Sequence, residues 1–166
     1  MKLLRLFIPL MIVVPLLSAD RIAILPFTPE GIDSTPANTF TDRIRTALVG
    51  YSQFDVMERE KLQAIIEEQE MSLTGLCDEE CIIEVGQIAN VQYMVSGNIR
   101  NLGQAIYLGA RIIDVETSKV MSEQDLTVPS NDLNALLDAA PDLADAVMQQ
   151  FVEKKGLTNG GSMAIV

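Results

Sequence analysis

The side chains that could do chemistry in this chain are two cysteines, Cys77 and Cys81, because the sequence contains no histidine. They are four positions apart, close enough for a disulfide at the start of a helix, and closing so short a loop stabilises a fold by about 2 kcal/mol. A redox-active pair needs basic neighbours or a helix amino terminus to favour the thiolate, whereas the acidic residues 78–80 lie between these cysteines. The pattern favours a structural disulfide, ahead of two free buried thiols and, last, a thiol-disulfide enzyme.

Other kinds of catalytic or metal site lack the residues that they need. Without histidine, neither a Ser-His-Asp nor a Cys-His arrangement can form, and zinc would need a second pair of soft ligands. Gly97, Gly103 and Gly109 are spread along expected strands and turns, so they form no phosphate-binding loop. Acidic runs such as 67–68 are typical of solvated helix faces. We therefore expect a protein that is not an enzyme, with no catalytic residue, metal or cofactor.

The elements around the cysteines alternate between strands and helices. Apolar or alternating runs predict strands, and apolar residues at helical spacing predict helices. The strands are expected at 21–28, 54–58, 91–99, 105–115 and 120–128, and the helices at 35–50, 62–69, 81–89 and about 130–151. The first helix is expected to be capped by Thr35 and stopped by Gly50. The order β-α-β-α-α-β-β-β-α predicts an α/β fold, a single domain with a mixed five-stranded sheet and helices packed on it.

Two residues inside expected helices need an explanation. Gly86 costs about 1 kcal/mol against alanine in a helix, so it indicates either close approach of a neighbouring element or a tolerated surface position. Pro141 interrupts the last helical region and predicts either a kink or two helices, the second opening at Pro141. The apolar stripe of this region, which includes Phe151, is expected to cover the sheet, with a partner-binding groove as the alternative.

The first 19 residues have the pattern of an export signal. Lys2 and Arg5 precede the apolar run 6–17, and Ser18 and Ala19 form a small-residue exit. The run is shorter than the roughly 20 apolar residues of a membrane span and contains two prolines, so we expect residues 1–19 to be a cleaved signal peptide and the mature chain to have no transmembrane segment. No cysteine near this expected cleavage site offers a lipid acceptor, which argues against a lipoprotein.

The charge of the expected mature chain excludes some partners. Removing residues 1–19 leaves 10 basic and 23 acidic residues, a net charge of −13. Such a surface repels phosphate backbones and anionic lipid headgroups, so no nucleic-acid partner is expected. It indicates solubility, with an acidic docking surface for a basic partner as the alternative. The roughly 130 residues of 20–152 suffice for one hydrophobic core.

Several short motifs in a fixed order resemble a known family. They are Val56-Met57-Glu58-Arg59, Glu67-Glu68-Gln69, Gly86 with Val95-Ser96-Gly97, and Asp114-Val115-Glu116-Thr117. Together they resemble the amino-terminal domain of TolB, the related domain of the curli secretion channel protein CsgG, and penicillin-binding-protein activator lipoproteins. Ser118 stands where such domains often have glycine. The resemblance covers almost all of 20–152.

The resemblance implies an exported α/β domain, similar in fold to anticodon-binding domains, that makes protein contacts in the cell envelope and does no catalysis. It implies a periplasmic or outer-membrane-associated location. The chain lacks surplus strands of about 9 to 11 residues for membrane-crossing hairpins, which argues against channel formation. Residues 153–166 are expected to contain a linker and then, at their end, either the start of a truncated β domain or a frayed tail.

The function expected from these observations is a non-catalytic binding or scaffolding module whose partner is another cell-envelope protein. The sheet edge or the acidic helices are expected to make the contact, with Tyr107, Arg111 and Phe151 of the terminal helix as contact candidates. The first alternative is a subunit of a secretion or transport assembly at the outer membrane, which would form a homo-oligomer. The second is the thiol-disulfide enzyme.

Overall fold

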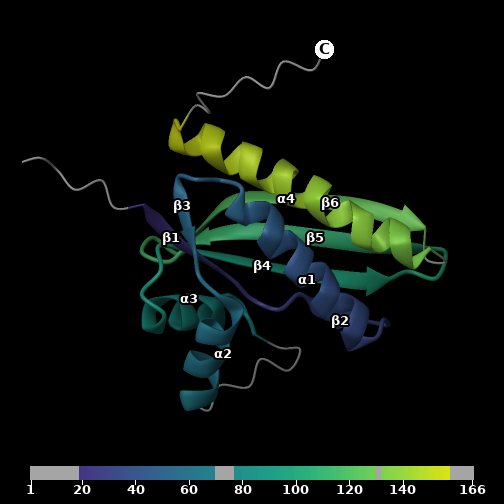
Figure 1. The fold of residues 1–166 in the computed structure, drawn as a ribbon, viewed down its shortest axis with the longest axis horizontal. Helices are drawn as coiled ribbons and strands as arrows, with labels where there is room; N and C mark the ends of the chain where they lie inside the picture. The colour runs from purple at the N-terminus through teal and green to yellow at the C-terminus, as the bar shows by residue number, and fades with distance from the viewer. Residues whose placement is uncertain (1–18, 70–76, 130–131, 158–166) are drawn as a thin grey trace, which may run out of the picture.

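A mixed β-sheet with helices on both faces forms the centre of the fold, as the computed structural model shows (Figure 1). The structure describes residues 19–69, 77–129 and 132–157. The strands are β1 (Asp20–Ile24), β2 (Thr28–Glu30), β3 (Phe54–Val56), β4 (Tyr93–Asn101), β5 (Ala105–Asp114) and β6 (Lys119–Pro129). The helices are α1 (Ser34–Val49), α2 (Arg59–Glu68), α3 (Glu79–Ile88) and α4 (Leu133–Lys155). The predicted α/β class and the mixed sheet are confirmed.

The sheet combines a parallel half and an antiparallel half in the order β3-β1-β4-β5-β6. Strand β1 pairs in parallel with both β3 and β4. Strands β4, β5 and β6 are joined by hairpins and pair antiparallel. Strands β4 and β5 pair over nine consecutive positions, which is the longest run of pairs without a register shift in the sheet.

The prediction of five strands is wrong, because the run expected as one strand at 21–28 is two strands. The main chain leaves the ladder around Pro26, which has no N–H to donate. The N–H of Phe27 instead donates to the hydroxyl of Thr41 on α1, at 3.0 Å. Strand β2 then resumes pairing with β4 further along, with Thr28 opposite Asn98. The sheet therefore has six strands.

The helices begin and end close to where the pattern places them. Helix α1 begins one residue before the expected cap, at Ser34, so Thr35 lies inside the helix and its predicted capping role is wrong. The predicted stop at Gly50 is confirmed. Helix α3 is capped by Asp78, whose side chain accepts a hydrogen bond from the N–H of Cys81.

Gly86 allows α3 to pack directly on the sheet. It is buried, and a Cβ at this position would lie 2.6 Å from Val115 Cγ2 and 2.8 Å from Met94 Cγ. The explanation by close approach is confirmed, and the alternative of a tolerated surface glycine is wrong.

Helix α4 continues through Pro141 as one helix, so the alternative of two helices is wrong. A proline at position 141 leaves the carbonyl of Leu137 without its helical donor. Arg43 of α1 supplies the missing donor, since its Nη1 lies 3.3 Å from the Leu137 oxygen. The helix ends at Lys155, so residues 153–155, assigned to the linker from the sequence, belong to α4. The expected linker from 158 onward lies outside the described residues, as do residues 1–18 of the expected signal peptide.

The two faces of the sheet carry separate cores. Helices α1 and α4 cover one face over most of its length, burying β-strand residues such as Leu108 and Ile112 (Figure 1). Helices α2 and α3 cover the other face only near β1 and the carboxyl end of β5, where Met94 and Ile113 are buried. On the rest of that second face, toward the β4-β5 turn, no helix of the described residues packs.

The β5-β6 turn explains two positions of the family motif. One carboxylate oxygen of Asp114 accepts hydrogen bonds from the N–H of Thr117 (2.7 Å) and from its hydroxyl (2.8 Å). Ser118 follows with φ of 56°, in the left-handed region that favours glycine.

No helix in the described part of the chain has the length and apolarity needed to cross a bilayer.

Candidate binding groove

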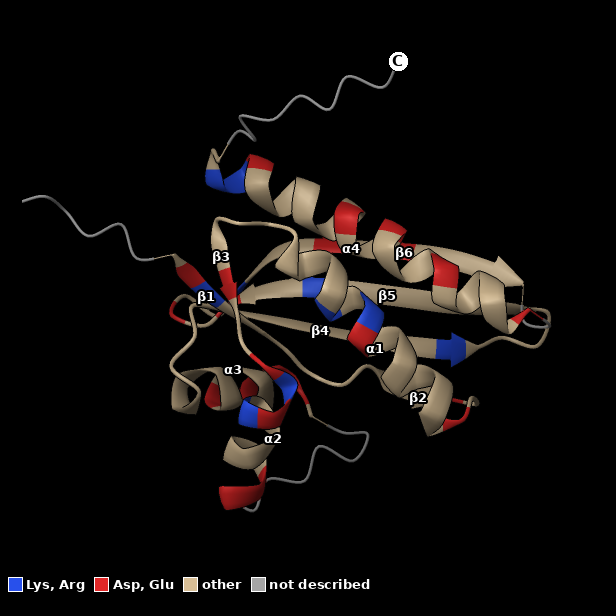
Figure 2. Ribbon diagram, in the orientation of Figure 1, with Lys and Arg blue, Asp and Glu red and all other residues tan. Residues whose placement is uncertain are grey.

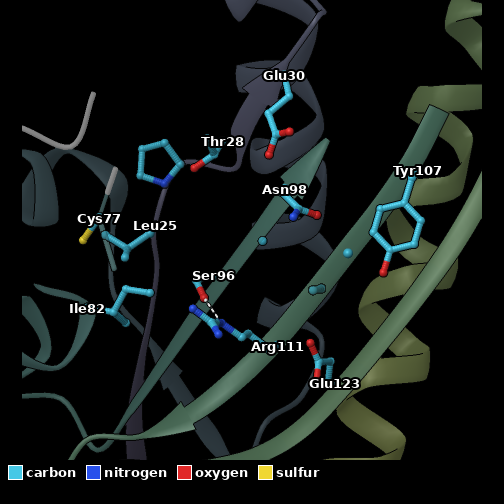
Figure 3. Close-up of a pocket in the computed structure, with 14 residues that line it drawn as sticks. Leu25, Thr28, Glu30, Cys77, Ile82, Ser96, Asn98, Tyr107, Arg111 and Glu123 are labelled. Carbon is cyan, nitrogen blue, oxygen red and sulfur yellow. Dashed lines mark hydrogen bonds between the residues drawn. The ribbon is translucent and has the colours of Figure 1, made fainter. Parts of the chain in front are cut away.

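A groove of about 320 Å³ lies on the second face of the sheet, where the cover of α2 and α3 ends (Figure 3). Its floor is the central part of β4 and β5. One wall contains Leu25, Cys77, which lies just before α3, and Ile82 of α3. The opposite side contains Tyr107 and Glu123. The groove thus combines residues from both halves of the sheet with the disulfide-bonded start of α3.

Gly109 on the floor of the groove makes space for two neighbouring side chains. It lies between Tyr107 and Arg111 on the same face of β5, because side chains alternate along a strand. A Cβ at position 109 would lie 2.8 Å from Asn98 Oδ1 and 3.2 Å from Tyr107 Cε1. Tyr107 therefore leans along the strand over the glycine. Glycine inside a strand often marks a place where another molecule or main chain approaches closely.

Arg111 is held in place by one hydrogen bond, and its charge has no partner among the described residues. Its Nε donates to Ser96 Oγ at 3.1 Å, and Ser96 is only 7% exposed. Glu123 lies directly across from Arg111 on β6, yet no carboxylate of the described chain lies within 4 Å of the guanidinium. The terminal nitrogens of Arg111 remain donors facing the groove.

Asn98 contributes an acceptor to the same groove. Its Oδ1 is buried and has no hydrogen-bond donor in the part of the chain that the structure describes. A buried acceptor left unpaired costs about 1–3 kcal/mol. Asn98 Oδ1 is therefore an acceptor that the described chain does not satisfy, and because it is covered, an incoming donor would reach it once the Asn98 amide or a side chain over it turns.

An ion pair fixes the outer end of the groove. Arg100 on β4 donates to both carboxylate oxygens of Glu30 on β2, from Nε at 2.8 Å and from Nη2 at 3.3 Å. This contact lowers the pKa of Glu30 and raises that of Arg100, in each case chiefly through the hydrogen bond. The pair joins the short strand β2 to the sheet at its open end.

The cysteines form the predicted disulfide, Cys77–Cys81. Both half-cystines are partly exposed, and Cys77 lines the groove. The alternative of two free thiols is wrong in this structure, since the bond is formed. The bond ties the segment before α3 to the first turn of the helix and so shapes the wall next to Leu25.

The structure brings Tyr107 and Arg111 together but separates Phe151 from them. Phe151 is a residue of α4 and is fully buried, with its ring centroid 4.8 Å from that of Tyr93 and 5.3 Å from that of Phe54. Its role as a contact candidate is therefore wrong, because it is a core residue on the opposite face of the sheet. The expectation that the apolar stripe of α4 covers the sheet is confirmed.

The acidic residues are dispersed over the helices, strands and loops (Figure 2). Within residues 19–69, 77–129 and 132–157, no group of three histidine, cysteine or acidic side chains is arranged to hold a metal ion. In particular, Glu67-Glu68 and Glu79-Glu80 lie on exposed helix surfaces.

Sequence reasoning did not single out Ser96, Asn98 and Gly109 as groove residues. A signal was present, because Ser96 and Asn98 are polar residues at alternate positions between the apolar residues Val95 and Ile99. Gly109 interrupts the alternation of β5 between a tyrosine and an arginine. What the sequence could not supply is the register that places Asn98 opposite Gly109 and Ser96 opposite Arg111.

Solved structures with the same fold come from several bacteria. The LpoB C-terminal domain from Salmonella enterica has 15% identity and a TM-score of 0.56, over 68% of this chain and 84% of that one. Lipoprotein GNA1162 from Neisseria meningitidis has 17% identity and a TM-score of 0.57, over 80% and 96%. TolB from Acinetobacter baumannii has 18% identity and a TM-score of 0.55, over 82% of this chain but 29% of TolB. At these identities the likeness establishes the fold.

The sequence itself matches a family over more than half of its length. No curated protein matches the chain. The family described as "Curli production assembly/transport component CsgG" matches residues 29–129, which include most of β2, all of β3 to β6 and the whole floor of the groove. The predicted resemblance to CsgG and TolB domains is confirmed, and the chain belongs to the CsgG family.

Proposed function

We propose that this protein is an exported, non-catalytic binding module of the cell envelope, and that it docks another envelope protein in the groove around Gly109. The observation that carries the proposal is the open end of the sheet, where Tyr107 and Arg111 flank a hollow with unpaired polar groups. Tyrosine and arginine are enriched among the residues that dominate binding energy at protein interfaces.

Export is supported by two independent features. The first 19 residues have the pattern of a secretory signal, and disulfides such as Cys77–Cys81 form and persist in oxidising compartments. One of the structures that share the fold is a lipoprotein. A periplasmic or outer-membrane-associated location fits these observations.

The sequence also suggested the sheet edge as a docking site. The groove is a better docking site than the edge strand β6. At the edge strand β6, the N–H of Glu123 donates to Gln150 Oε1 at 2.8 Å. The carbonyl of Val120 accepts from Lys154 Nζ at 3.1 Å. Side chains of α4 therefore occupy main-chain groups that an added strand would need, and Pro129 lacks an N–H at the end of the strand.

A subunit of an outer-membrane assembly is the alternative function, and membership of a family described as a curli production assembly and transport component favours it. The two functions differ in the expected mass of the protein in solution. Light scattering on the protein recovered after export should give a monomer for the binding module and a ring-sized particle for the assembly subunit.

A photo-crosslinker placed in the groove tests the docking function. Replacing Tyr107 by benzoylphenylalanine in living cells and irradiating intact envelopes should give one dominant adduct of defined size, whose partner mass spectrometry identifies. Adding Gly109→Leu should remove this adduct, because the larger side chain fills the hollow. Self-crosslinked products would instead favour the assembly subunit.

The matched control places the same crosslinker at Thr127. This residue is exposed on the same sheet face, opposite Tyr107 in the β5-β6 register, but does not line the groove. Equal adducts from positions 107 and 127, or adducts that survive Gly109→Leu, would rule out docking in the groove. Thermal melting of each variant confirms that it is folded.

A further inference from the structure

We propose that the groove recognises the main chain of an extended peptide segment, with Arg111 donating to a peptide carbonyl and Asn98 accepting from a peptide N–H. This inference rests on the proposed docking function and specifies the chemistry of the docked partner. It follows from what the groove offers, which is a set of donors and a separate acceptor with a hollow between them.

The donors belong to a guanidinium whose orientation is already fixed. The hydrogen bond from Arg111 Nε to Ser96 Oγ holds one edge of the group against the floor of the groove. The terminal nitrogens face the groove without a carboxylate within 4 Å in the described part of the chain. A carbonyl oxygen would therefore bind to donors that lose little freedom on binding.

The acceptor excludes a simple anion as the preferred ligand. Asn98 Oδ1 is buried and has no donor among the residues that the structure describes. A carboxylate held by Arg111 would leave this oxygen unpaired, whereas a peptide N–H would satisfy it. Glu30 and Glu123 also line the groove and disfavour a negatively charged ligand. A neutral peptide group matches both features.

The spacing of donor and acceptor fits an extended chain. Asn98 is opposite Gly109 in the β4-β5 register, and Arg111 is the next residue of β5 on the same face. Such diagonal neighbours lie about 7–8 Å apart, which is about two residues of extended chain at roughly 3.3 Å per residue. Gly109 lies opposite Asn98 and has Asn98 Oδ1 and the partly exposed Tyr107 ring over it, so a peptide main chain would approach the sheet here as that ring turns aside.

Ester replacement in a bound peptide tests this chemistry. A library of linear peptides is selected on the exported, disulfide-bonded protein and counter-selected on Gly109→Leu. The best binder is then synthesised with each main-chain N–H replaced in turn by an ester oxygen. One ester should weaken binding on the order of tenfold, the effect of one lost hydrogen bond to a buried acceptor. The loss should disappear on Asn98→Leu, because that variant has no acceptor.

Two further variants keep the test independent of folding. Asn98→Asp retains an acceptor at the same position and should retain the ester effect, which guards against misfolding of Asn98→Leu. Thr127→Val changes the same sheet face outside the groove and should bind every peptide as the wild type does. Arg111→Met should weaken all the peptides, esters included, by a similar factor.

The contrary outcomes separate the two proposals. If groove-dependent peptides are recovered and no ester matters, main-chain recognition is wrong while docking in the groove stands. Binding that is lost on C-terminal amidation, or on replacing peptide Asp and Glu by Asn and Gln, would show carboxylate recognition and overturn the inference. A library that gives no peptide sensitive to Gly109→Leu would contradict both the inference and the docking function.

Discussion

The two faces of the sheet are made by the same strands but have different neighbours. On β5, the residues that face α1 and α4 are Ile106, Leu108, Ala110 and Ile112, and none is more than 3% exposed. The residues that alternate with them are Tyr107, Gly109 and Arg111, which are all partly exposed. One strand thus serves a sealed core on one side and an open polar groove on the other.

Helix length explains part of this difference. Helix α4 has 23 residues and α3 has 10, which at 1.5 Å per residue gives about 35 Å and about 15 Å. The ten residues of β5 extend over about 34 Å. A helix as short as α3 can cover only part of such a strand, so the second face becomes polar where its cover ends. The groove lies on the part of the sheet that the described helices leave uncovered.

The largest expected contrast is between Phe151→Ala and Tyr107→Ala. Phe151 is fully buried against Tyr93 and Phe54, so its truncation should cost about 3–5 kcal/mol of unfolding free energy. Tyr107 is partly exposed at the open end, so its truncation should cost less than about 1 kcal/mol. Urea unfolding followed by circular dichroism measures both.

Partner binding should show the opposite order for the same two variants. Tyr107→Ala should abolish or strongly weaken binding in the groove, while folded Phe151→Ala protein should bind nearly as the wild type does. Similar stability losses for the two variants would mean that the open end is part of the core, and the comparison of faces would fail.

The disulfide gives the next largest effect, on the face covered by α2 and α3. Replacing both Cys77 and Cys81 by serine should reduce the unfolding free energy by about 2 kcal/mol, because the bridge closes a short loop. It should also weaken groove binding, since Cys77 lines the wall. Urea unfolding and peptide binding, with and without reductant, measure the two effects. Disulfide reductase activity in the wild type that is lost in the double variant would instead support the thiol-disulfide enzyme.

Much of the fold was predictable because its signals are local. The alternation of β5, the helical spacing of Phe40, Ile44 and Leu48, and the stop at Gly50 each depend on neighbours a few residues away, and all are confirmed. The division of the first strand was missed because Pro26 acts through a distant partner. The N–H of its neighbour Phe27 donates a hydrogen bond to Thr41 on α1, and no local sequence pattern predicts this contact.

The groove was predictable only in pieces. Tyr107 and Arg111 were candidates from their positions on an alternating strand, and Cys77 from its spacing to Cys81. Their meeting in one groove depends on the β4-β5 register and on where α3 lies, both of which are set by long-range packing. Phe151 was misassigned because an apolar helix stripe has the same spacing whether it packs on a sheet or binds a partner.

A smaller effect is expected at the hydrogen bond from Arg43 to the Leu137 carbonyl, which compensates for Pro141 inside α4. Arg43→Met removes the donor to the Leu137 carbonyl and should cost about 1 kcal/mol, with little due to the exposed ion pair to Asp138. In a Pro141→Ala background the helix supplies its own N–H, so the cost of Arg43→Met should fall. Urea unfolding of the four proteins completes the cycle. An unchanged cost would assign the effect to the ion pair.

The smallest effect should be an alkaline pH dependence on the face covered by α1 and α4. The Tyr51 hydroxyl donates to Asp145 Oδ1 at 2.8 Å, between the end of α1 and α4. Burial, followed by this hydrogen bond, raises the pKa of Tyr51 above its usual value near 10.

The sign of this effect follows from which state keeps the proton. Above pH about 10 the unfolded chain loses the tyrosine proton while the folded protein retains it, so the contribution of Tyr51 is fully present below that pH and declines as the pH rises further. The difference in unfolding free energy between the wild type and Tyr51→Phe should therefore shrink between about pH 9 and 11. A difference that stays constant with pH would mean that Asp145 does not hold the Tyr51 proton in the folded protein.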